Sequence, residues 1–365
     1  MNILHLEYAG KTGGIEKLCK DIGNTAQKDQ HYFLFVHEGG ILYDEMKRDH
    51  LNVECLNLNN YQIVRLHEMI VKYVSKFNIE AIIVHHPSPL IWIAIELYLH
   101  HNERAKVFIY VHNTYQEITA RKKTRKYIYD DLLKRADGII TISKWVKHTI
   151  QENVLIPDDK IKVIYNGIVC PQNQGEYTGK LHSPVEIIYI GRLIEKKGVQ
   201  VLLKAAARIS PKQDYRIHIV GDGSYKKELE KQAKELGIEP MVTFWGNQRN
   251  ITERLSNADI FVHPAIWEEG FGISIIEAMS CGKICIASRK GAIPEIIDDG
   301  VNGFLVESNN EDELSKKIME VSKMTDEQRI IIEENARKRA NDFTIDILQE
   351  KLHDFLRRPA MKSQA

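Results

Sequence analysis

The chain has 365 residues, of which 43% are hydrophobic and 27% are charged, and its formal net charge is zero. This length suits two domains that each bury a core, and the neutral balance argues against nucleic-acid binding driven by bulk charge. The five cysteines show no CxxC spacing, which indicates neither a disulfide framework nor a zinc site, so we expect a reducing, cytoplasmic location.

The N-terminal residues MNILHLEYAG predict a strand, with neither the basic start nor the long apolar stretch of a signal peptide. The most apolar window, residues 81–99, is interrupted by His85, His86, two prolines and Glu96, so it is a poor membrane span. We expect a soluble protein, with peripheral contact at the inner face of the membrane as the alternative.

Short β-rich runs alternate with amphipathic helical patterns, which predicts parallel sheets with helices on both faces. In the first half we expect strands near residues 2–7, 32–37, 53–56, 81–84, 106–111, 138–142 and 162–165. Helices are expected between them near residues 14–27, 63–77, 90–99, 122–135 and 143–152.

The polar stretch CPQNQGEYTGKLHSP, which begins at Cys170, is typical of an interdomain linker. After it we expect strands near 185–190, 215–220, 242–244, 260–263, 284–287 and 303–306, and helices near 199–209, 225–236, 251–256 and 273–279. Residues 312–356 are predicted to be helical apart from short turns, and the last residues to be frayed.

These patterns predict an α/β protein of two doubly wound domains, residues 1–170 and 185–342, joined by a linker at 171–184. In such open sheets, ligands bind outside the carboxyl ends of the strands. We therefore expect the functional site in a cleft where two such edges face each other.

The stretch HPAIWEEGFGISIIEAMSCGKICIA, residues 263–287, predicts a strand, a glycine-rich turn and a helix. The first amides of a helix, approached through glycine, form an anion site. Carboxylates would repel an anion, so Glu269 and Glu277 are better explained as acceptors of hydrogen bonds from sugar or ribose hydroxyls.

Gly13 and Gly14 follow the first predicted strand and open a helix. They predict either a tight turn or a loop that faces phosphate. The chain lacks GxGxxG and GxxxxGK[ST] at this turn, which argues against a dinucleotide site and against a Walker loop.

Arg192 and Lys197, in GRLIEKKG, lie in the loop after another predicted strand. They are either solvated surface charges or the cations that a departing diphosphate needs.

His112 ends a predicted strand and is followed by a polar loop, so it is either structural or a contact to substrate. Eleven of the fifteen histidines precede residue 150, but no two share a helix at metal-ligand spacing with a carboxylate partner, so we predict no metal.

A basic run follows the His112 loop. It is either a solvated helix face or a surface that docks an anionic acceptor or phospholipid headgroups, and it consists of Arg121, Lys122, Lys123, Arg125 and Lys126.

Together these motifs resemble family 4 of the retaining glycosyltransferases, which have the GT-B fold of two facing Rossmann-like domains. The resemblance covers nearly the whole chain. Its most specific part is EGFGISIIEAM, with two glutamates at the family's spacing, and GRLIEKKG, GGIE and YNGI at 165–168 occur in the family's order.

The resemblance implies that Glu277 holds the ribose hydroxyls and Glu269 the hydroxyls of the donor sugar. Gly270, Phe271 and Gly272 would offer backbone amides to the sugar and the diphosphate.

In the same resemblance, Arg192 and Lys197 neutralise the leaving nucleoside diphosphate without a metal or cofactor. Gly14, with Gly13, closes over it from the other domain, and His112 contacts the sugar. Here the family more often has His-Asp, whereas this chain has Asn113.

The implied reaction moves a hexose-type sugar from a nucleoside-diphosphate donor, with UDP favoured over GDP, to a glycan or lipid-linked acceptor in surface polysaccharide or glycoconjugate synthesis. Both glutamates lie in one segment, which favours a front-face substitution over a double displacement. A helix near residues 343–358 would pack back on the first domain.

Two alternatives remain open. A non-hydrolysing sugar-nucleotide 2-epimerase shares the architecture and the ligand, but it needs acid and base groups at the sugar and no acceptor. A non-catalytic sugar-nucleotide-binding protein could keep every motif.

Overall fold

The computed structural model describes residues 1–11, 13–86, 88–101, 105–120, 123–171, 179–209 and 214–358. It divides into a first unit, Met1–Gly167 with Ile345–Ala365, and a second unit, Ile168–Thr344. The expected frayed end and most of the expected linker, residues 359–365 and 172–178, lie outside the described residues.

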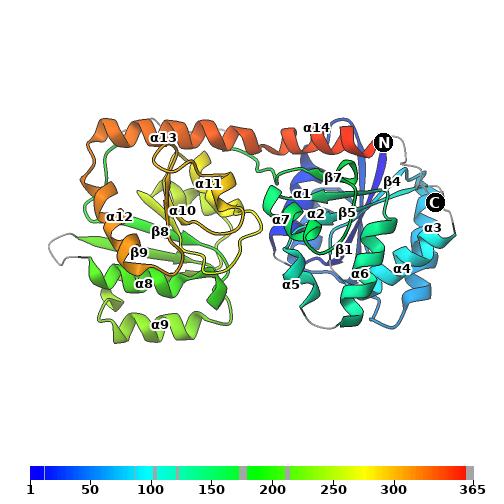
Figure 1. Ribbon diagram of the computed structural model, residues 1–365, viewed down its shortest axis with the longest axis horizontal. Helices are drawn as coiled ribbons and strands as arrows, with labels where there is room; N and C mark the ends of the chain where they lie inside the picture. Colours follow the sequence, from blue (N-terminus) through cyan, green and yellow to red (C-terminus); the bar gives the residue numbers. More distant parts are fainter. Residues whose placement is uncertain are drawn as a thin grey trace. The chain divides into compact units, whose positions relative to one another are not determined.

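The sheet of the first unit is parallel throughout, with strand order β3-β2-β1-β4-β5-β6-β7 (Figure 1). Strand β1 lies near the centre, where Leu4 pairs with Tyr32 of β2 on one side and with Ile82 of β4 on the other. The strands are β1 Asn2–Ala9, β2 Gln30–Glu38, β3 Asn52–Cys55, β4 Ala81–Val84, β5 Lys106–Val111, β6 Gly138–Thr141 and β7 Ile161–Val163.

Two groups of helices pack in the first unit. One group is formed by α1 (Gly14–Thr25), which contacts α2 (Ile41–Arg48) and the C-terminal helix α14 (Ile345–Leu356). In the other group α4 contacts α3 and α6. Helix α5 follows β5, and α7 follows β6. The bounds of these five helices are α3 Ile63–Phe77, α4 Pro89–His100, α5 Tyr115–Thr119, α6 Lys123–Arg135 and α7 Lys144–Gln151.

Hydrogen bonds hold α14 on the first unit. The side-chain amide of Gln349 donates to the carbonyl of Ile22 at 2.9 Å and to Oγ1 of Thr25 at 2.8 Å, both on α1. His353 lies 2.7 Å from Asp29, just before β2. The last described helix is therefore part of the unit that contains the first strand.

The second unit repeats this order with six parallel strands, β10-β9-β8-β11-β12-β13. Its strands are β8 Val185–Ile190, β9 Tyr215–Val220, β10 Val242–Gly246, β11 Ile260–His263, β12 Ile284–Ser288 and β13 Phe304–Val306. Its helices are α8 Val199–Arg208, α9 Lys226–Glu235, α10 Ile251–Ser256, α11 Ile273–Ser280, α12 Glu311–Lys323 and α13 Asp326–Ala340.

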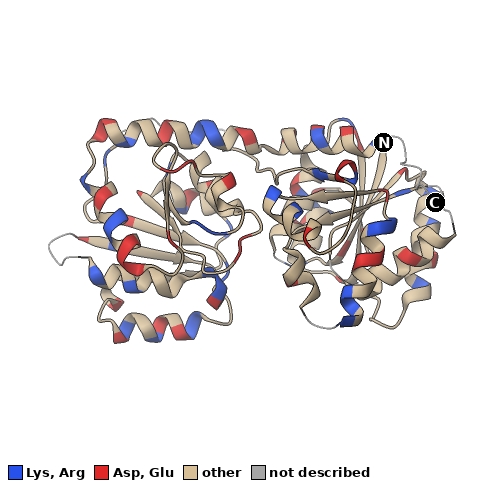
Figure 2. Ribbon diagram, in the orientation of Figure 1, with Lys and Arg blue, Asp and Glu red and all other residues tan. Residues whose placement is uncertain are grey.

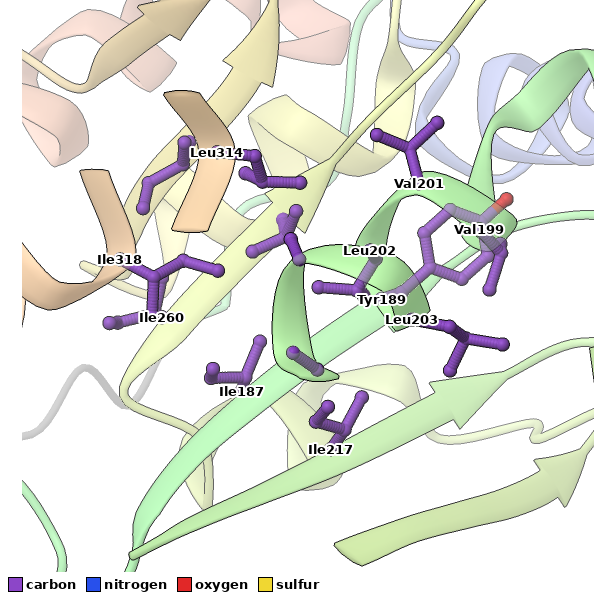
Figure 3. Close-up of a cluster of buried hydrophobic side chains, with 14 of the residues drawn as sticks. Ile187, Tyr189, Val199, Val201, Leu202, Leu203, Ile217, Ile260, Leu314 and Ile318 are labelled. Carbon is purple, nitrogen blue, oxygen red and sulfur yellow. The ribbon is translucent and has the colours of Figure 1, made fainter. Parts of the chain in front are cut away.

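A core of aliphatic side chains joins this second sheet to α8, α9 and α12. Figure 3 shows Ile187, Ile217 and Ile260 of the strands beneath Leu202 of α8 and Ile318 of α12. All five are essentially fully buried, and complete burial of such a side chain contributes about 1.5–3 kcal/mol.

Short 3₁₀ helices complete the fold: η1 Asp158–Lys160, η2 Glu195–Lys197, η3 Glu239–Met241, η4 Ile293–Glu295 and η5 Asn341–Phe343. No helix among the described residues is both long and apolar enough to cross a bilayer.

The predicted doubly wound α/β class is confirmed. Two helices were not predicted, α2 and the five-residue α5, because each is too short to show a repeated apolar face. In both sheets the strand order reverses next to the first strand, between β1 and β4 and between β8 and β11. These reversals mark the carboxyl edges at which such sheets bind ligands.

Candidate active site

Two loops meet where the strand order of the second unit reverses. One follows β8 and carries Arg192 and Lys197, and the other follows β11 and carries Glu269. The amide of Ile266 in the second loop donates to the carbonyl of Lys196 in the first at 3.1 Å. The loops are therefore joined through their backbones.

Gly198 is required for this close approach. Its φ of +73° lies in the left-handed region, and a Cβ here would lie 1.8 Å from the carbonyl oxygen of Pro264. Any side chain would force the two loops apart.

An ion pair connects the loops at the site. Nζ of Lys197 lies 2.6 Å from Oε2 of Glu269, and Nε2 of His263 lies 3.1 Å from the same oxygen. The Lys197 and Glu269 side chains are only 20% and 16% exposed, and that of His263 is 2% exposed. The sequence placed Lys197 and Glu269 in one site but did not show that they contact each other.

These neighbours determine the charge of Glu269. Burial by itself raises the pKa of its carboxyl group, but the positive charge of Lys197 and the hydrogen bond from His263 outweigh burial and hold the pKa far below its usual value. Glu269 therefore remains ionised at neutral pH. It can accept hydrogen bonds from hydroxyl groups, but it has no proton to donate as a general acid.

The loop after β12 fixes the backbone of Glu269. The amide of Ala292 donates to the Glu269 carbonyl at 2.8 Å, and Gly291 has φ +57° with no room for a Cβ, which would lie 2.3 Å from that carbonyl oxygen. The adjacent Glu268 pairs with Lys290 at 3.0 Å. Sequence analysis identified neither this loop nor the contact that His263 makes; the position of His263 at a strand end was its only signal.

The Gly-Phe-Gly turn leads directly into α11. The side chain of Phe271 is buried and packs edge-on against Phe343, with ring centroids 5.6 Å apart, so this residue can offer a ligand only its backbone. Gly272 adopts φ +113° immediately before the helix. Gly270 and, on α11, Glu277 are half-buried.

Arg192 is exposed directly after β8, and its carbonyl accepts a hydrogen bond from the Tyr189 hydroxyl at 3.1 Å. The second unit therefore brings Lys197 and Glu269 into contact. It places Arg192, the Gly-Phe-Gly turn and Glu277 on the segments around them.

In the first unit, Gly13 is the residue before α1 and Gly14 begins it. Gly13 has an extended backbone with φ −160°, which any residue can adopt. A Cβ there would meet only the flexible carboxylate of Glu16. Backbone geometry therefore does not require glycine at residue 13, which weakens the tight-turn explanation for that residue.

His112 follows β5, is 8% exposed, and lies with its Nε2 3.0 Å from Nδ1 of His85. Burial lowers the pKa of His112 to about 3. At neutral pH it is a neutral imidazole, suited to hydrogen bonding but not to supplying positive charge.

The described residues of the basic run lie on α6, which Figure 2 shows with blue segments. Arg125 lies 5.3 Å from the centroid of the Trp92 ring, and Lys126 lies 5.4 Å from that of Tyr115. Lys123 and Lys126 are exposed, whereas Arg121 and Lys122 lie outside the described residues. Part of the run therefore packs on aromatic rings.

Two family models match the chain in succession. Residues 12–170 match the model described as Glycosyltransferase Family 4, and residues 173–339 match the model described as Glycosyl transferases group 1. Together they cover the strands, loops and helices that build the site.

Individual relatives have low sequence identity. A glycosyltransferase of Methanocaldococcus jannaschii whose activity is not characterised is 29% identical over 223 residues, 60% of this chain and 59% of the relative. The N-acetyl-alpha-D-glucosaminyl L-malate synthase of Bacillus anthracis is 27% identical over 315 residues, 81% of both chains. The chain thus spans less than two thirds of the length of the first relative and more than two thirds of the length of the second.

Among solved structures, Anabaena HepE in complex with UDP-glucose is 25% identical, with a TM-score of 0.80, over 98% of this chain and 99% of that one. This similarity along nearly the full length confirms the expected GT-B fold class, which combines two Rossmann-like sheets with C-terminal helices.

Proposed function

Because the chain belongs to the group 1, family 4 glycosyltransferases, we propose that it transfers a hexose-type sugar from UDP to a glycan or lipid-linked acceptor, with retention of anomeric configuration. The observation that carries this proposal is the contact between Lys197 and Glu269 at the carboxyl edge of the second sheet. This contact supports the proposal because a cation suited to phosphate lies beside a carboxylate that can accept hydrogen bonds from hydroxyl groups.

In the proposed complex, Glu269 accepts hydrogen bonds from the hydroxyls of the donor sugar and Glu277 from those of the ribose. The amides of Gly270, Phe271 and Gly272 face the sugar and the diphosphate. The buried ring of Phe271 and the left-handed backbone of Gly272 support this assignment, since both leave the backbone as the binding surface.

The leaving diphosphate becomes more negative as the glycosidic bond breaks. Lys197 and the exposed Arg192 supply positive charge to it, and no metal is needed in this account. The acceptor oxygen bonds to the anomeric carbon on the face from which the diphosphate departs, and a departing phosphate oxygen takes the acceptor's proton. The pKa of Glu269 is held far below its usual value, so its carboxylate is a weak base for that proton, which supports assigning the proton transfer to the phosphate.

In this proposal Gly13 and Gly14 bind the diphosphate, and His112 donates or accepts one hydrogen bond at the sugar.

UDP is favoured over GDP because HepE, which shares the fold along its full length, was solved with UDP-glucose. We place the product in surface polysaccharide or glycoconjugate synthesis, the setting that the family resemblance implies for a glycan or lipid-linked acceptor.

The proposal is tested by measuring thermal unfolding with UDP-, GDP- and ADP-sugars, followed by product analysis. A UDP-sugar should raise the melting temperature, because a ligand that binds only the folded state stabilises it. That sugar should then be transferred when saccharide and lipid-linked acceptors are added, and transfer should persist when EDTA is present in the assay.

Other outcomes contradict the proposal. Epimerisation of the donor with no acceptor present identifies the 2-epimerase alternative, and stabilisation without turnover of any acceptor in the panel identifies a binding protein. Loss of transfer in EDTA at an unchanged melting temperature refutes the metal-free leaving group.

For the basic run we propose peripheral docking on anionic membranes. Each basic residue near such a surface contributes about 1 kcal/mol, so replacing Lys122, Lys123 and Lys126 by serine should sharply reduce sedimentation with phosphatidylserine vesicles. A control with equal loss of charge is serine at the exposed Lys227, Lys231 and Lys234 of the second unit. Equal sedimentation of both triple variants removes the hypothesis.

A further inference from the structure

A cluster of potential metal ligands lies inside the first unit, between the sheet and α1. His5 of β1, Cys19 of α1 and His85, directly after β4, are all 2% exposed or less. Nδ1 of His5 lies 2.8 Å from Nε2 of His85, and Sγ of Cys19 lies 3.9 Å from the same nitrogen. The three ligand atoms all lie within 4.8 Å of one another.

A buried carboxylate adjoins the three side chains. The Cys19 thiol donates to Oε1 of Glu7 at 2.9 Å. The Glu7 side chain is fully buried, and its Oε2 has no hydrogen-bond partner among the described residues. Burial raises the pKa of the Glu7 carboxyl group to about 8, so the group is mostly protonated at neutral pH, and a cation beside it would instead favour the ionised form.

In His5 and His85, the ring nitrogen that points away from the cluster, here called the outer nitrogen, is already hydrogen-bonded. Nε2 of His5 lies 2.8 Å from Nδ1 of His31, and Nδ1 of His85 lies 3.0 Å from Nε2 of His112. Metal-bound histidines typically hydrogen-bond through the nitrogen that does not bind the metal, and this bond fixes the ring orientation. Here the inner nitrogens point at each other and at the thiol, while the outer ones hold the rings.

We propose that His5, Cys19 and His85 bind one zinc ion, with water as the fourth ligand and Glu7 as an adjacent carboxylate that balances the charge. Two neutral imidazoles, a thiolate and a carboxylate carry two negative charges, so a divalent cation makes the buried site neutral. A mixed set of nitrogen, sulfur and oxygen ligands suits tetrahedral zinc.

Binding displaces three hydrogens: the thiol proton of Cys19, the hydrogen shared between His5 and His85, and the proton that Glu7 holds in the interior. The thiol and carboxyl protons are released to solvent, and the hydrogen between the histidines moves to an outer ring nitrogen. Zinc–nitrogen bonds of about 2.0–2.1 Å at tetrahedral angles need the two inner nitrogens about 3.3 Å apart, a small widening of the present contact.

The site would stiffen the first unit. It ties α1, which begins at Gly14, to the strand end that carries His85 and, through His85, to His112. None of the three protein ligands has a part in the proposed reaction, so the proposal does not depend on that reaction. His31, bonded to His5, also lines a surface pocket with Asp29 and His353.

The test is the zinc content of the full chain, produced in zinc-supplemented medium, dialysed and measured by mass spectrometry. We expect close to one equivalent in the wild-type protein and in Cys55→Ser, a control in which the altered thiol lies on β3. Cys19→Ser should lose most of the zinc. Equal zinc in Cys19→Ser and wild type overturns the proposal.

A second measurement needs no variant. Wild-type protein refolded with cobalt in place of zinc should show the near-ultraviolet absorption of a thiolate–cobalt bond, and zinc should remove that absorption. Wild-type chain that contains no zinc and gives no such absorption overturns the proposal, whether or not Cys19→Ser folds.

Discussion

Replacing Glu269 by alanine should reduce the rate of sugar transfer by roughly tenfold or more while the protein remains folded. The variant removes the carboxylate that we propose holds the sugar hydroxyls. It also releases Lys197 and His263 from the oxygen that positions both of them. Initial rates at saturating donor, together with the melting temperature, measure the two effects separately.

Glu268 provides the matched control for this prediction. It is the neighbouring residue and also a paired glutamate, but it pairs with Lys290, away from Lys197. Glu268→Ala should therefore keep most of the activity. If Glu269→Ala transfers sugar at the wild-type rate, its assigned role is wrong.

Replacing Lys197 by alanine should reduce transfer by a similar factor, mainly through kcat. The ammonium group acts most strongly on the charge that develops as the diphosphate leaves, and only interactions that strengthen in the transition state raise kcat. The variant also leaves Glu269 without its main counter-charge. Breaking a buried pair costs about 3 kcal/mol, so a lower melting temperature should accompany the loss of activity.

Lys196 is the control for Lys197. Its ammonium lies 4.2 Å from the centroid of the Trp267 ring, and the residue is exposed. Lys196→Ala should have near wild-type kcat. A Lys197→Ala variant that changes only KM would instead indicate that Lys197 binds the ground state and the transition state equally.

The double variant, with alanine at both Lys197 and Glu269, tests their coupling. Removing both charges leaves no unpaired ion, so we expect its melting temperature to lie above that of Lys197→Ala. A double variant whose losses of stability simply add would show that the two side chains act independently.

Much of the fold was predictable because the signals are local. Runs such as AIIV and GIIT, bounded by turns, are typical of strands buried on both faces, and they form β4 and β6. The 15-residue amphipathic pattern over 63–77 is α3. In contrast, α2 and α5 were missed, because about one or two turns of helix do not establish a period.

The candidate site was predictable only as separate motifs. Sequence patterns placed Lys197 after β8 and Glu269 after β11, at strand ends where ligands bind. They could not show that the two charges meet, since 72 residues separate them. The loop at Gly291 and the hydrogen bond from His263 depend on the same long-range contacts.

The histidines show the limit of spacing arguments most clearly. No local metal motif joins His5, Cys19 and His85, which lie on one strand, one helix and the end of another strand. Only the parallel pairing of β1 with β4, with α1 packed above them, brings the three together.

By itself, the sequence determined the alternation of strands and helices, the doubly wound class and the order of the motifs, because these depend on period and on residues adjacent in the chain. Tertiary structure alone decided which charges are paired, that Glu269 stays ionised, and that His5, Cys19 and His85 lie close together in the interior. The physical reason is that burial and Coulomb interactions depend on distance in space. The crossovers between strands set that distance, whereas the spacing of residues along the chain does not.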